Sequence, residues 1–308
     1  MRFLIPITLL AGLALAQDSA APVSRIIRIE MAEGTTGGNI RHGPISYEHP
    51  DPRGITATVS NLTILAQNAS LAVPADQQGE LLLAEAEGSR EASFSGTVYV
   101  ERGRLEASGP GLVYSEATGL GLLQGPADIF IAAAEADDED VRISAGEVEF
   151  DVDTDMSTSR GAVLLESGSQ TATADLLVYA EERSLGVLSS SDGQVRIVRL
   201  ADDGSELVIT ADEVRVLTDD EMLWARGNVT VVDGDITSTG DEVFFDDAAS
   251  RAEVLGSPAH SVDEAGGVEL TGDRLEHRTD LGVVSIIDAS QPSEFDVNAF
   301  ALAEGELD

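Results

Sequence analysis

Residues Glu147 to Asp153 read Glu-Val-Glu-Phe-Asp-Val-Asp, and this stretch decides the fold. Val148, Phe150 and Val152 are two residues apart, and carboxylates occupy the positions between and around them. Side chains two apart lie on one face of a β-strand, whereas a helix would distribute these acids around its axis. The stretch therefore predicts a strand with one apolar face and one acidic face.

The same pattern recurs along the chain. In six aligned segments the second residue carries a hydroxyl, the third is Gly or Ala, the sixth is aliphatic and the eighth is bulky. Successive segments start 36, 29, 37, 29 and 32 residues apart, which indicates a repeated supersecondary unit. The segments are Ala107–Tyr114, Ile143–Phe150, Ala172–Tyr179, Ile209–Val216, Ser238–Phe245 and Leu270–His277.

Each unit reads as a strand, a turn and a returning strand. Turn-prone residues follow the segments, as at Thr218–Glu221, and an apolar strand such as Asn228–Val232 comes next. The third column is small because a larger side chain there would collide with a neighbouring strand or bend the sheet. A further column, fifteen residues after the fourth position of a segment, holds Gly125, Gly161, Gly227 and Gly256. The sequence predicts an all-β fold of repeated β-hairpins.

The N-terminus has the three parts of an export signal. Arg2 precedes the apolar run Phe3–Leu15, and Ala-Leu-Ala at 14–16 offers a cleavage site. The run is too short for a membrane span of roughly 20 residues, so we expect cleavage after residue 16 and export to the periplasm or cell envelope.

The rest of the chain is predicted to divide into regions that differ in how regularly they show the repeat. The acidic run 137–140 is a candidate boundary, and its alternative is a solvated loop inside one continuous sheet, so one or two domains remain open. The predicted divisions are a linker with a first strand at 17–35, an irregular β region at 36–140, a β-repeat domain at 141–296 and a tail at 297–308.

Composition excludes several classes of function. The chain has 18 Lys and Arg against 56 Asp and Glu, a net charge of -38 and no cysteine. Such a charge repels nucleic acid and anionic membrane surfaces, so neither is an expected partner. Without cysteine there are no disulfides, thiolate metal sites or thiol nucleophiles. We interpret the acids mainly as a solvated surface.

No motif points to catalysis, a metal or a cofactor. The four histidines lack metal-ligand spacing, and His277 is expected to pack because its column is otherwise apolar or aromatic. Asp151, Asp153 and Asp155 imitate the start of a calcium loop. That loop needs Gly at its sixth position and Glu at its twelfth, where this chain has Met and Ala. We therefore predict no catalytic residue, no metal site and no cofactor.

The repeat resembles the OstA-like family, the periplasmic lipopolysaccharide-transport proteins of the LptA kind. The likeness rests on Ile-Thr-Ala-Asp-Glu-Val at 209–214, Ala-Arg-Gly-Asn-Val-Thr-Val at 225–231 and Ile-Thr-Ser-Thr-Gly-Asp-Glu-Val at 236–243. It covers the chain between Arg104 and Asp296. The resemblance implies an open β-jellyroll, or "taco", in which two antiparallel sheets hold acyl chains between them, with two such units in tandem as one arrangement.

The resemblance also implies partners. They are an envelope lipid or lipopolysaccharide-like glycolipid, other envelope transport components, and further copies of the chain added by edge-strand stacking. In the terminal unit Val268–Asp288 the acids outnumber the cations less steeply than elsewhere. Self-association is therefore predicted to use the C-terminal edge and to strengthen with salt.

Two functions remain open from the residues. One is a non-enzymatic bridge that carries acyl chains of lipopolysaccharide or another envelope lipid between membranes. The other is a structural cell-envelope scaffold with a filled core and no ligand. For the carrier, the expected lipid-binding interior is Leu112, Tyr114, Val148, Phe150, Leu177, Tyr179, Val214, Val216, Val243, Phe245 and Leu275.

Overall fold

The structure is a computed structural model that describes residues 24–77, 81–135, 139–191, 193–201, 204–288, 290, 293, 295–303 and 306. The predicted export signal at 1–16 lies outside these residues. The described chain contains 21 strands, three short 3₁₀ helices and no α-helix, so the all-β prediction is confirmed. None of its helices is long and apolar enough to span a bilayer.

The strands fall into two length classes. Long strands of 11 to 13 residues are β7 (Glu91–Arg102), β8 (Leu105–Ser115), β9 (Leu120–Ile131), β10 (Val141–Asp151), β11 (Met156–Ser167), β12 (Gln170–Ala180), β17 (Met222–Asp233), β18 (Ile236–Asp246), β19 (Arg251–Asp263) and β20 (Val268–Arg278).

Short strands occupy the N-terminal region, one interval in the middle and the C-terminal edge. They are β1 (Arg28–Met31), β2 (Thr35–Gly38), β3 (Ile45–Glu48), β4 (Ile55–Val59), β5 (Leu62–Ala66), β6 (Asn68–Ala72), β13 (Leu185–Ser189), β14 (Val195–Leu200), β15 (Glu206–Ala211), β16 (Glu213–Leu217) and β21 (Val283–Ile286). The 3₁₀ helices are Ala75–Gln77, Glu181–Arg183 and Val297–Phe300.

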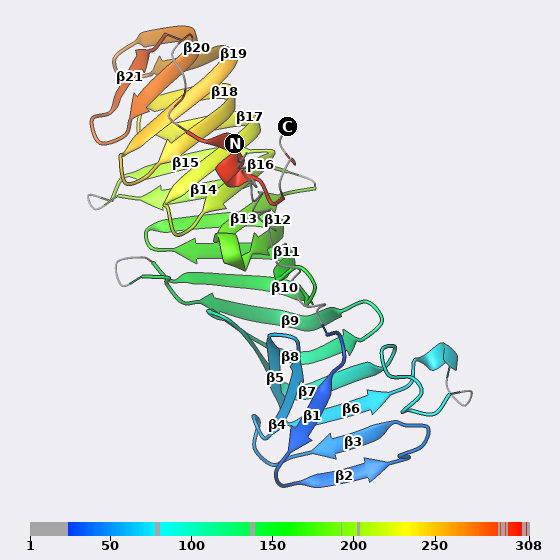
Figure 1. The fold of residues 1–308 in the computed structure, drawn as a ribbon. Helices are drawn as coiled ribbons and strands as arrows, with labels where there is room; N and C mark the ends of the chain where they lie inside the picture. Colours follow the sequence, from blue (N-terminus) through cyan, green and yellow to red (C-terminus); the bar gives the residue numbers. More distant parts are fainter. Residues whose placement is uncertain are drawn as a thin grey trace, which may run out of the picture.

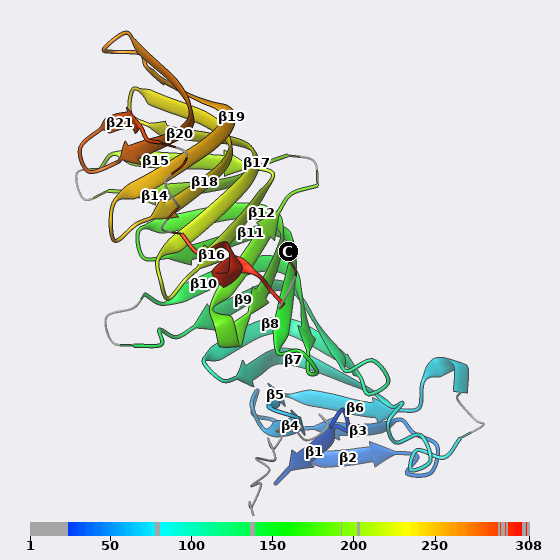
Figure 2. The same ribbon diagram turned by 45° about the horizontal axis from the view of Figure 1, so that its top comes forward.

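All strand pairs are antiparallel, and the strands stack in chain order along an elongated molecule (Figure 1). The same stacking is seen after a 45° turn (Figure 2). Each long strand shifts register near its middle, as β10 does against β11 between Ser144 and Glu147. A β-bulge inserts an extra residue and bends the strand. Val141, Ile143 and Ala145 of β10 are buried before the shift, and Val148 and Phe150 are buried after it, so both halves turn apolar side chains to one interior.

These bends divide the stack into two layers. Layer A contains the second halves of β8, β10, β12, β18 and β20, the first halves of β7, β9, β11, β17 and β19, and the short strands β2, β3, β6, β13, β16 and β21. Layer B contains the other halves with β1, β4, β5, β14 and β15. The predicted two antiparallel layers are present, joined at the bend in one hydrogen-bonded ladder.

The small-residue columns lie at the bend. A Cβ added to Gly109 would stand 2.5 Å from the carbonyl oxygen of Gln124, and one added to Gly240 would stand 2.4 Å from that of Leu255. Real Cβ atoms do not approach a backbone oxygen so closely. The packing reason predicted for the third column is confirmed at these two glycines.

The acidic run 137–140, of which residues 137 and 138 lie outside the described residues, falls between β9 and β10 in the sequence. These strands pair with each other from Val141 opposite Ile131 to Asp151 opposite Leu120. The ladder is therefore continuous across this position. A division into separate folding units there stays a prediction.

A second apolar cluster lies on the outer face of layer A, and we call it the outer aromatic patch. It consists of Leu185, Leu217, Trp224 and Phe244, covered by Phe295, Val297, Phe300 and Leu302 of the C-terminal segment. Trp224 stacks on Phe244 at 5.7 Å, and Phe300 is 1% exposed. The segment predicted only as a tail is thus packed where the structure describes it.

Candidate binding site between the two layers

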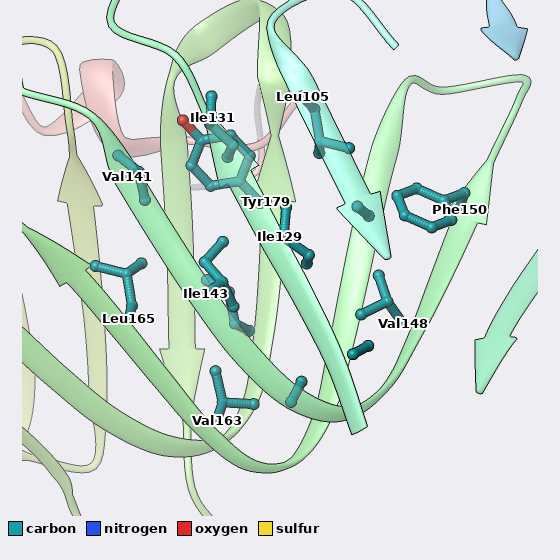
Figure 3. Close-up of a cluster of buried hydrophobic side chains, with 14 of the residues drawn as sticks. Leu105, Ile129, Ile131, Val141, Ile143, Val148, Phe150, Val163, Leu165 and Tyr179 are labelled. Carbon is teal, nitrogen blue, oxygen red and sulfur yellow. The ribbon is translucent and has the colours of Figure 1, made fainter. Parts of the chain in front are cut away.

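The space between the layers is lined by the eleven residues that the repeat singled out. All of them lie on the inner face of layer A. Ten are buried with exposures of 0 or 1%, and Val216 is half-buried. In Figure 3, Val148 and Phe150 on one arm of bent strands face Ile129, Ile131, Val141 and Ile143 on the other. The structure brings these side chains together; whether they bind lipid stays a prediction.

The opposite wall belongs to layer B and was missed from the sequence. Its inward residues are Leu105, Ile129, Ile131, Val141, Ile143, Val163, Leu165, Ile197, Ile209 and Val231. The alternation Val-Arg-Ile at 141–143 indicates a strand with one apolar face, as the six aligned segments do. The segments identify only layer A, because the β-bulge shifts the alternation between Ile143 and the sixth and eighth positions, Val148 and Phe150.

The turns between successive strands lie along the free edges of the two layers, and we call the opening between these edges the mouth. Polar side chains of one edge bind those of the other at several places, and we call these pairs the mouth bridges. They are Asn61–Asp155, Arg102–Glu181, Arg104–Asp219, Gln170–Asp247, Arg199–Asp247 and His277–Asp233.

The bridge between Arg102 and Glu181 is the most buried of the arginine bridges. Arg102 Nε donates to Glu181 Oε1 at 2.9 Å, and another guanidinium nitrogen donates to the Asp151 carbonyl at 3.0 Å. The Arg102 side chain is 1% exposed. Burial raises the pKa of the Glu181 carboxyl although Arg102 acts to lower it. Loss of either partner would leave the other as an unpaired buried charge, which is strongly destabilising. The pair therefore holds the two layers at a fixed spacing.

A cavity of about 270 Å³ opens in the mouth. Its floor consists of Leu165, Ala172 and Ile197 from layer B and Val216 from layer A, and Gly168 and Leu217 also line the cavity. Its rim consists of the polar residues Glu139, Ser167, Ser169, Gln170, Thr171, Thr218, Glu221 and Asp247. The floor residues belong to the inward rows of the two layers, so the apolar interior reaches the surface here.

The interior becomes more polar toward the C-terminal end. Ser238 and Ser261 are buried and hydrogen-bonded to each other at 3.0 Å. His277 is fully buried, as its column predicted, and its Nε2 lies 3.0 Å from Asp233 Oδ2. No group of three or more metal-ligating side chains occurs among the residues that the structure describes.

The similarity of this chain to known proteins is distant. No family model matches the chain, and no curated protein matches it. Among solved structures, the chain is similar to LptH, the LptA homologous periplasmic component of the conserved lipopolysaccharide transport device from Pseudomonas aeruginosa. The TM-score is 0.32 and the identity 15%, over 34% of this chain and 75% of that one. At this level of similarity, function has to be argued from the chain's own geometry.

Proposed function

We propose that the protein is a non-enzymatic carrier that holds acyl chains of an envelope lipid between its two layers. The observation that carries the proposal is the mouth cavity, where apolar rows from both layers meet an opening to solvent. Apolar binding needs no charged partner, since each buried methylene contributes about 0.8 kcal/mol.

The size of the cavity fits the entry of a chain. An engineered apolar cavity of ~150 Å³ holds a benzene molecule. The mouth cavity, at about 270 Å³, therefore accommodates several methylenes without rearrangement. A longer chain reaches further only if side chains inside move or the neighbouring mouth bridges separate.

Transport between membranes requires a partner at the ends of the stack. At the C-terminal end, β21 pairs with only the second half of β20. Val268, Leu281, Val283 and Ile286 are 50 to 64% exposed there. An open strand edge beside exposed apolar side chains favours addition of another strand. We propose that another copy of the chain or a further envelope component adds at this edge.

The edge is tested by placing proline in β21. Val283→Pro removes a backbone donor from the last strand, and Leu200→Pro makes the same kind of change on a strand elsewhere. Light scattering across a salt series should show association by the parent chain, strengthening with salt, and less association by Val283→Pro. If association weakens with salt, or if Val283→Pro associates as the parent chain does, the proposal that association uses the β21 edge is wrong.

Native mass spectrometry of protein purified from its own host tests the carrier. We expect a bound lipid, and we expect Ala172→Phe, which fills the cavity floor, to lose it. Thr173→Phe is the matched control, because the neighbouring side chain points to the opposite face of β12. A ligand-free spectrum, with no uptake of added lipids, contradicts the proposal.

A second candidate is a structural scaffold with a filled core. It is favoured by the near-zero exposure of the inward residues, which leaves no open trough along most of the interior. A scaffold predicts that Ala172→Phe and Thr173→Phe behave alike in every lipid-uptake measurement. The same pair of variants therefore separates the two functions.

A further inference from the structure

The rim of the mouth cavity differs from its floor in chemistry. Carboxylates stand on both sides of the opening, with Glu139 from the layer B edge and Glu221 and Asp247 from the layer A edge. No arginine or histidine lines the cavity among the described residues. The site therefore pairs an apolar floor with an anionic rim.

The three rim carboxylates are not equivalent. Asp247 already binds Arg199 and accepts a hydrogen bond from Gln170 Nε2 at 2.7 Å. Glu139 and Glu221 are exposed, and in the described part of the chain neither forms an ion pair. These two carboxylates remain available to a ligand that reaches the floor.

The surrounding field favours a cation at this position. The chain carries a net charge of -38, so an anion that approaches the mouth is repelled within about a Debye length, ~8–10 Å, of the surface. A protonated amine is attracted by the same field and donates hydrogen bonds to carboxylate oxygens. A phosphate has only acceptor oxygens to offer to a rim of acceptors.

We propose that the mouth cavity takes an amphiphile whose polar head carries a protonated amine. The alkyl chain lies on Leu165, Ala172, Ile197 and Val216, and the ammonium group lies between Glu139 and Glu221. This assignment rests on the proposed carrier function and names the charge class of its ligand.

Three probes with the same alkyl chain test the assignment: dodecylammonium, dodecyl phosphate and dodecyl maltoside, each below its micelle concentration. Calorimetry with the full chain should give the tightest binding for the ammonium, weaker binding for the maltoside and the weakest for the phosphate. High salt should narrow the difference between ammonium and phosphate, because these charges are exposed.

Paired substitutions locate the effect at the rim. Glu139→Gln with Glu221→Gln should weaken ammonium binding by about five- to tenfold, as expected for two partly exposed ion pairs, and leave maltoside binding unchanged. The matched control is Glu33→Gln with Asp241→Asn, which removes the same charge from exposed positions away from the mouth. It should alter ammonium binding by less than about twofold.

The outcomes separate the two proposals. Maltoside binding without any preference for the ammonium over the phosphate contradicts the amine assignment and leaves the carrier function standing. An equal loss of ammonium affinity in the rim and control pairs also contradicts it. Binding of none of the three probes contradicts both.

Discussion

Phe244 and Phe245 are neighbours in β18, and they belong to two different apolar clusters. Phe245 faces the interior, where every second strand supplies a similar residue at the same position of the motif. Phe244 faces outward onto Trp224, under a segment that begins some fifty residues later in the chain. The interior is a repeated feature supported by neighbours on both sides, whereas the outer aromatic patch occurs once and depends on the C-terminal segment for its cover.

The difference teaches that burial alone does not define a role. Both phenylalanines are at most 3% exposed. Removing the Phe245 ring opens a cavity between the layers. Removing the Phe244 ring weakens the packing of the C-terminal segment, which can detach while the sheet stays folded. Four predictions test this distinction.

The largest effect is expected for Phe245→Ala. Loss of a fully buried aromatic side chain from a core lowers the free energy of unfolding by about 3–5 kcal/mol. The neighbouring strands cannot move into the space without losing their register. Phe244→Ala should cost about half as much in the free energy of unfolding, because the covering segment can adjust. Denaturant unfolding followed by far-UV circular dichroism measures both. Equal losses for the two variants contradict the distinction between the clusters.

Phe300→Ala should act on the outer aromatic patch alone. Trp224 is the only tryptophan in the chain, and Phe300 packs against it at 6.0 Å between ring centroids. We expect a red shift of its emission and a loss of about 1–2 kcal/mol of stability, less than for a core site. Leu200→Ala, at a side chain that is 51% exposed, should leave both unchanged. An unaltered spectrum in Phe300→Ala would show that the segment does not cover Trp224 in solution.

Acid should weaken the attachment of the same segment, by less than about 1 kcal/mol, before it unfolds the interior. Hydrogen bonding from Arg215 holds the pKa of the Glu306 carboxyl below its ordinary value of 4.5. A lowered folded-state pKa gives stability that is present above the ordinary value and lost as pH falls through the lowered one. Trp224 emission should therefore shift slightly on acidification below about pH 4.5, ahead of the loss of the far-UV signal, and this small shift should be absent in Glu306→Gln. Simultaneous transitions would tie the segment to the core.

The smallest effect is expected for Glu306→Gln at neutral pH. The ion pair between Arg215 and Glu306 is partly exposed at its acidic end, so its loss costs less than about 1 kcal/mol. Arg215 keeps Glu213 and the Phe300 carbonyl as partners. Trp224 emission should change little at pH 7, and its small acid shift should be absent. A large shift at pH 7 would make this pair the main attachment of the segment.

Local pattern was enough to predict one wall of the interior. The motif places bulky residues two apart on the same strand half, and period alone fixes the face on which they lie. The third column predicted close approach of a neighbouring strand, because nothing larger than Gly or Ala occupies it in any of the six segments. These inferences need only neighbours along the chain and in the next repeat.

The remaining features depend on partners far apart in sequence. Arg102 and Glu181 are separated by 79 residues. Nothing in the sequence around either residue specifies the offset between the two layers that brings these turns together. Trp224 and Phe244 alternate with inward residues, so the strands are apolar on both faces and the period gives no reason to expect an outer cover. The mouth cavity is likewise a gap between two edges, and no local pattern encodes it.

The aligned segment recurs on alternate strands, so the repeating unit of this molecule is a pair of strands. Neighbouring strands are about 4.8 Å apart, and one duplication therefore adds about 10 Å of reach. The direction of every strand and the cross-section of the interior are preserved, because an even number of strands has been inserted. Copy number can therefore adjust the length of the molecule in fixed increments, independently of the shape of its interior.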